Sequence, residues 1–76
     1  MRTLQKIGQD LPGCEVALTW READDSFSEE IVTLPTAYAA AEAIALLVLI
    51  RPGGRTEAMV RQVLKTVPKA PRPGRG

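Results

Sequence analysis

One segment of strict alternation, residues 14–21, constrains the fold of this chain more than any other feature. Its apolar positions fall two residues apart, and they are Cys14, Val16, Leu18 and Trp20. The positions between them carry polar side chains and one alanine. A period of two that includes β-branched and aromatic residues is typical of a strand with one buried face. The chain must therefore build at least part of a β-sheet.

A second strand is expected after a short polar connection. Residues 23–26, Ala-Asp-Asp-Ser, favour a turn because Asp and Ser side chains hydrogen-bond to nearby backbone groups. Residues 27–34 are then typical of a strand that ends at Pro35, whose ring fixes φ and removes a backbone donor. Two strands joined this closely predict an antiparallel hairpin.

Two helices are expected after the hairpin. The first covers residues 37–50, with Thr36 as its N-cap and a Pro-Gly-Gly sequence after its end. The second covers residues 56–67, where the apolar side chains gather on one face and Pro68 follows. Residues 1–8 favour only a short amphipathic turn, because Leu4 and Ile7 lie three positions apart and Gly8 limits its length.

These elements define a small α+β fold in which an antiparallel β-hairpin packs against two helices. A hairpin alone is only marginally stable in water, so the helices must cover its apolar face. Residues 1–67 form the expected single domain. Residues 68–76, rich in proline, glycine and cations, form an expected disordered basic tail. The predicted core consists of Val16, Leu18, Trp20, Ile31, Ile44, Leu47, Val48, Val60, Val63, Leu64 and Val67.

The net charge of +1 conceals a division along the chain. Residues 1–50 carry three cations and eight carboxylates, a net charge of −5, whereas residues 51–76 carry seven cations and one carboxylate, a net charge of +6. Charge asymmetry of this kind indicates a charged tail or a charged partner.

Composition argues against catalysis. The 76 residues include no histidine and one cysteine, which removes His-assisted nucleophiles, His-ligated metals and Cys-pair zinc sites. We therefore expect no enzymatic activity, no cofactor and no metal. The apolar run at residues 37–50 is shorter than the ~20 residues that cross a bilayer, and the first ten residues lack the apolar stretch of a secretory signal. Together with the lone thiol, this predicts a cytoplasmic protein that does not bind membranes.

The first candidate binding group is acidic. Five carboxylates fall within residues 22–30, and they are Glu22, Asp24, Asp25, Glu29 and Glu30. They could serve only to keep a hairpin tip soluble. Alternatively, they dock on a surface rich in Lys and Arg, including one that otherwise binds nucleic-acid phosphates.

The second candidate group is basic and consists of Arg61, Lys65, Lys69, Arg72 and Arg75. These cations either solubilise the chain and neutralise the acidic hairpin, or contact phosphates in a salt-dependent manner. No aromatic residue lies among them to stack on bases.

The third candidate group lies on the face of the first helix that should be solvated but is largely apolar, and it consists of Tyr38, Glu42, Leu46 and Leu49. Another part of the chain could cover this face. Alternatively, it supports a homodimer or docking on another protein.

The sequence thus predicts a small regulatory protein that binds another protein. Its acidic hairpin would occupy a basic surface on that partner. By size and charge layout alone, it could be an inhibitor of a larger nucleoprotein machine encoded by a phage or mobile element, as anti-CRISPR proteins are. The alternative is a small nucleic-acid-binding protein that uses the basic helix and tail.

Overall fold

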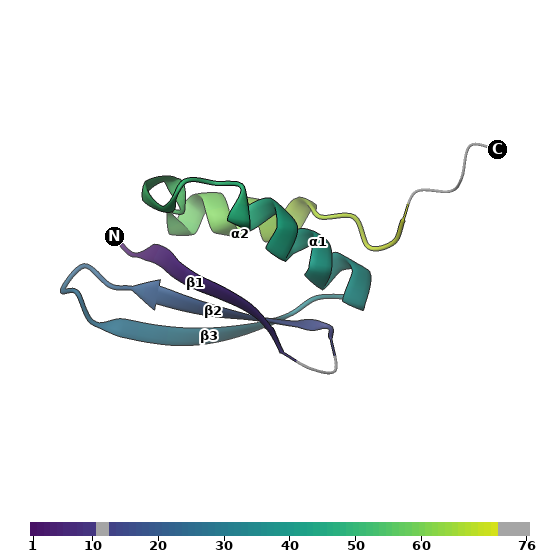
Figure 1. Cartoon of the computed structure of the whole chain (residues 1–76), viewed down its shortest axis with the longest axis horizontal. Helices are drawn as coiled ribbons and strands as arrows, with labels where there is room; N and C mark the ends of the chain where they lie inside the picture. Colours follow the sequence, from purple (N-terminus) through teal and green to yellow (C-terminus); the bar gives the residue numbers. More distant parts are fainter. Residues whose placement is uncertain (11–12, 72–76) are drawn as a thin grey trace.

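The chain folds into a three-stranded antiparallel sheet with two helices on one of its faces (Figure 1). The computed structural model describes residues 1–10 and 13–71. Along the chain the elements are β1 (Thr3–Asp10), β2 (Glu15–Arg21), β3 (Phe27–Thr33), α1 (Ala37–Val48), the short 3-10 helix η1 (Pro52–Gly54) and α2 (Glu57–Thr66). The predicted α+β class, with an antiparallel hairpin packed against two helices, is confirmed.

β2 is the central strand, and its pairing with β3 is the predicted hairpin. The two strands pair over their full length without a register shift. In the connecting turn, Asp25 has a φ of 68°, a left-handed conformation that Asp tolerates better than most residues. The Asp24 carboxylate accepts hydrogen bonds from the backbone nitrogen and the hydroxyl of Ser26, at 3.0 and 2.6 Å. The polar side chains of the turn thus stabilise the hairpin locally.

The N-terminal segment is a strand, so the predicted amphipathic turn is wrong. β1 pairs with β2, and its register shifts after Leu4, where Gln5 is an extra residue. This bulge places Leu4 opposite Trp20 and keeps Ile7 on the same face of the sheet. Two apolar residues with an odd spacing therefore contribute to one buried surface.

A threonine caps the start of each helix. The cap at Thr36 was predicted, whereas Thr56, predicted as the first residue of its helix, is the N-cap of α2. The Thr36 hydroxyl accepts a hydrogen bond from the Ala39 backbone N–H at 3.0 Å, and the Thr56 hydroxyl accepts one from Met59 at 3.3 Å. α1 lies on the sheet mainly through small side chains, which allow the helix to approach closely. The residues that α1 buries are Ala39, Ala40, Ala43 and Leu47.

The core lies between the helices and the inner face of the sheet. Of the predicted core residues, those buried are Val16, Leu18, Trp20, Leu47 and Val60, and those partly buried against them are Ile44, Val63, Leu64 and Val67. Two predictions are wrong, because Ile31 is 50% exposed and Val48 is 53% exposed. The core also contains residues that the sequence analysis did not include, namely Leu4, Leu34, Ala39, Ala40 and Ala43.

The helices cover one face of the sheet, and the described residues leave the other face open (Figure 1). We call this open side the outer face. Along β3, alternate residues are exposed, starting from Phe27 and including Ile31. The strand pairings align Ile31 with Ala17 of β2 and with Gly8 of β1, so one row of small and apolar residues crosses the outer face.

Candidate functional site

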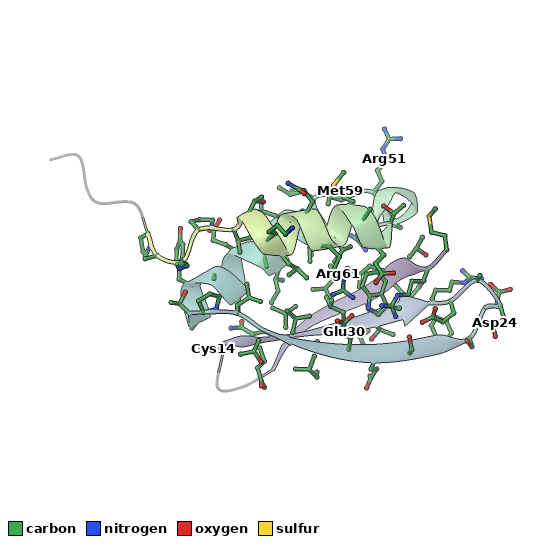
Figure 2. The ribbon with its side chains drawn as sticks, turned by 180° about the vertical axis from the view of Figure 1, so that it is seen from behind. Cys14, Asp24, Glu30, Arg51, Met59 and Arg61 are labelled. Atoms are coloured by element: carbon green, nitrogen blue, oxygen red, sulfur yellow. The ribbon has the colours of Figure 1, made fainter. Side chains whose placement is uncertain are left out.

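A charged network links α2 to the inner face of the sheet. Trp20 is fully buried in β2, and its indole Nε1–H donates a hydrogen bond to Glu30 Oε1 at 2.9 Å. Two guanidinium groups lie against the indole ring, with Arg2 Cζ 4.5 Å and Arg61 Cζ 5.6 Å from its centroid. Figure 2 shows Arg61 pointing from α2 toward Glu30. These distances allow cation–π attraction in addition to the ion pairs.

Each cation of this network is bonded to more than one carboxylate. Arg61 donates to the two Glu30 oxygens at 2.8 and 2.9 Å and to Glu57 at 3.0 Å. Arg2 donates to Glu57 at 2.8 and 3.1 Å and to Glu22 at 3.3 Å. Bidentate pairs of this kind add geometric specificity to the charge attraction. The network therefore ties the N-terminal segment, the hairpin and α2 to one another.

The pKa values of the network shift as expected for paired charges. Hydrogen bonds from Arg2 and Arg61 lower the pKa of Glu57 from 4.5 to about 2. The hydrogen bond from Arg61 is the largest cause of the lowered pKa of Glu30, and it outweighs the opposing effect of burial. The pKa of each guanidinium is raised, chiefly by Glu57 for Arg2 and by Glu30 for Arg61. All four groups stay ionised near neutral pH, so none of them is poised to transfer a proton there.

The structure separates the five predicted acidic residues, with two on the inner side of the sheet, two in the turn and one on the outer face. On the inner side, Glu22 and Glu30 are bonded to cations of the network. The other three are exposed: Asp24 and Asp25 lie in the turn between β2 and β3, and Glu29 lies on the outer face. Figure 2 shows Asp24 at the tip of the hairpin. The exposed acidic surface therefore consists of three carboxylates in place of five.

The predicted basic residues are likewise spread apart. Arg61 points into the network, where two glutamates accept its hydrogen bonds. Lys65 and Lys69 are exposed. The Lys69 carbonyl accepts a hydrogen bond from the Thr36 hydroxyl, which holds the first residues of the predicted tail beside the start of α1. Outside the described residues lie Arg72 and Arg75.

The apolar face expected on α1 is partly open. Leu46 is exposed and Leu49 is 80% exposed, whereas Tyr38 and Glu42 are half-buried. Met59 of α2 is exposed as well, and Figure 2 shows it pointing away from the sheet. Leu46 of α1 and Leu49 just after it are therefore accessible, as the docking hypothesis requires, but the group does not form one uniform surface.

A surface that the sequence analysis missed lies on the outer face of β3. Phe27 is 62% exposed and Ile31 is 50% exposed, and Glu29 lies between them on the same face. Residues two apart on a strand project from the same side, so these three side chains form a line. Ile31 was predicted to lie in the core. Ile31 and Val32 are adjacent, so the alternation in the sequence does not say which of the two faces outward.

The described residues offer no enclosed site. Among residues 1–10 and 13–71 there is no pocket, and no group of three or more His, Cys, Asp or Glu side chains is placed to hold a metal ion. In the same part of the chain, neither helix has the length and apolar character needed to cross a membrane. Comparison with protein-family models, curated proteins and solved structures finds no match to this chain. The candidate functional site is thus an exposed surface formed by β3 and the turn before it.

Proposed function

We propose that the chain is a non-catalytic protein-interaction module that contacts its partner through β3 and the turn between β2 and β3. The observation that carries this proposal is the line of Phe27, Glu29 and Ile31 on the outer face, where two large apolar side chains flank a carboxylate. Exposed apolar groups that lie close together on a small protein commonly mark a contact with another protein. A paired strand presents such groups in a fixed arrangement, which reduces the entropy lost on binding.

The inner side of β3 supports this arrangement. Glu30 lies between Glu29 and Ile31 in the sequence, and its carboxylate is held inward by Trp20 and Arg61. A slip of one residue would move every side chain of the strand to the other face. The inward bonds of Glu30 therefore oppose such a slip and keep the apolar line of β3 directed outward.

The charges near this line indicate the kind of surface that the partner presents. Glu29, Asp24 and Asp25 supply three carboxylates, and Arg21, which pairs with Asp25 at 3.1 Å, supplies one cation. A net negative rim of this kind attracts a surface rich in Lys and Arg and accelerates association with it. A protein that covers such a surface competes with nucleic-acid phosphates for the same cations. The module would therefore act as an inhibitor of a partner that binds nucleic acid.

The proposal is tested by quantitative affinity capture from the cells that encode the chain. Ile31→Ser and Glu29→Lys alter the outer face of β3, and Leu49→Ser is the matched control because Leu49 is more exposed but lies just after α1. We expect the wild-type chain and the control variant to retain the same partner. Both outer-face variants should lose it, and retention by wild type should weaken with added salt.

The opposite pattern would overturn the proposal. If Leu49→Ser loses the partner while Ile31→Ser and Glu29→Lys keep it, the contact lies on the helical side of the molecule. Circular dichroism of each variant shows whether a lost interaction reflects a changed surface or an unfolded chain.

A further inference from the structure

Hydrogen bonds at both ends of the hairpin determine which backbone groups of β3 face β2. The Glu22 nitrogen donates to the Ser26 oxygen at 2.8 Å, and the Leu34 nitrogen donates to the Cys14 oxygen at 2.8 Å. Backbone groups alternate in direction along an antiparallel pair, so the even-numbered residues of β3 direct their N–H and C=O groups toward β2. The residues that direct these groups toward the free edge are Phe27, Glu29, Ile31 and Thr33.

The two edges of the sheet differ in how open they are. β1 carries a bulge, Thr3 forms a bridge to Thr56, and the Leu4 nitrogen donates to the Arg55 oxygen at 2.8 Å. Within residues 27–33, β3 has no register shift, no proline and no lysine, which are devices that protect edge strands. Its inward charge, on Glu30, is held over the sheet by hydrogen bonds from Trp20 of β2 and from Arg61, so it does not cover the free backbone edge. The β3 edge is therefore ready to accept another strand.

We propose that this strand is β3 of a second copy of the chain, paired antiparallel so that Ile31 lies opposite Ile31 of the second copy. The inference does not depend on the proposed function, because it uses the backbone edge of β3 and needs no other partner. A twofold axis between the two isoleucines relates the copies, which is the usual symmetry of a homodimer.

Three antiparallel registers pair the outward backbone groups of the two β3 strands over at least five residues, and they are centred on Glu29, Glu30 and Ile31. The charges of β3 favour the one centred on Ile31. A pairing centred on Glu29 places two Glu29 side chains directly opposite each other, and one centred on Glu30 does the same for Glu30. Like charges directly opposite on paired strands are destabilising. The pairing centred on Ile31 instead places Glu29 opposite Thr33 and Glu30 opposite Val32. It forms about six backbone hydrogen bonds between the copies.

This register also extends the surface of each copy. The row of Gly8, Ala17 and Ile31 on the outer face continues without an offset into the same row of the second copy. The result is a continuous six-stranded sheet, with an apolar row across its middle and Glu29 of each copy beside it. Burial of the two isoleucines against each other adds apolar contact to the backbone hydrogen bonds.

Sedimentation of the full chain from micromolar to millimolar concentration tests the proposal. We expect a reversible monomer–dimer equilibrium. Ile31→Pro, which removes the outward N–H, should weaken the dimer by roughly tenfold or more. Ile31→Thr keeps the N–H and the β-branched shape, so it should weaken the dimer less. A chain that stays monomeric throughout this range, or a dimer that Ile31→Pro does not weaken, would overturn the proposal.

Disulfide crosslinking tests the register without relying on a proline variant that could disturb the hairpin. In a Cys14→Ala background, Ile31→Cys should crosslink readily to itself on mild oxidation. Glu29→Cys should not, because the two positions lie about 13 Å apart along paired strands in this register. Preferential crosslinking through Glu29→Cys, or through Leu49→Cys near the end of α1, would contradict it.

Discussion

Replacing Leu4 by alanine tests whether β1 belongs to the hydrophobic core. Leu4 is 1% exposed and lies opposite Trp20, so the truncation removes buried apolar contacts and leaves a cavity. Buried Leu→Ala changes cost about 2–5 kcal/mol. A chain of 76 residues has a free energy of unfolding of about 4–11 kcal/mol. The variant should therefore lose a large share of its stability.

Leu49→Ala is the matched control, since the same atoms are removed from a side chain that is 80% exposed. Its effect should stay within about 0.5 kcal/mol. Urea unfolding followed by fluorescence reports both changes, because Trp20 is the single tryptophan and is fully buried. The midpoint of Leu4→Ala should fall by at least about 1 M, and that of the control should hardly move. Equal midpoints for the two variants would refute the position of β1 in the core.

Three further predictions concern the network and the turns. The pKa of Glu57 is lowered from 4.5 to about 2, so its ion pairs stabilise the fold above pH 4.5 and are lost as the pH falls toward 2. Between these pH values, the urea midpoint of Glu57→Gln should therefore fall less than that of the wild-type chain. Gly13→Ala should cost about 1–3 kcal/mol because φ is 124°, whereas Gly8→Ala meets no atom within 4 Å and should show little change in thermal unfolding. Trp20→Phe removes the hydrogen bond to Glu30 and should cost about 1–3 kcal/mol by circular dichroism.

The elements that could be predicted from the sequence are those with one regular hydrophobic period or a clear cap. The alternation of residues 14–21 predicted β2, and the Thr36 cap predicted where α1 begins. β1 was missed because its bulge brings Leu4 and Ile7 onto one face from an odd spacing, which in a sequence suggests a helical turn. A bulge depends on the neighbouring strand and leaves no regular signal of its own.

The phase of β3 could not be derived from local pattern either. Ile31 and Val32 are adjacent, so each phase buries one of them and exposes the other. The outcome depends on Glu30, whose carboxylate accepts hydrogen bonds from Trp20 and from Arg61, 31 residues away in the sequence. The bond between Glu30 and Arg61 directs Glu30 inward, which separates it from Glu29 in the predicted acidic group and leaves Ile31 on the outer face.

Site-specific photocrosslinking in the cells that encode the chain tests the proposed contact surface most directly. A benzophenone amino acid replaces Phe27 on the outer face in one variant and Leu49 on the helical side in the other, both being highly exposed side chains. The proposal predicts that one protein partner is captured from position 27 and not from position 49. Capture from position 49 alone, or from neither position while the partner still copurifies, would contradict the proposal.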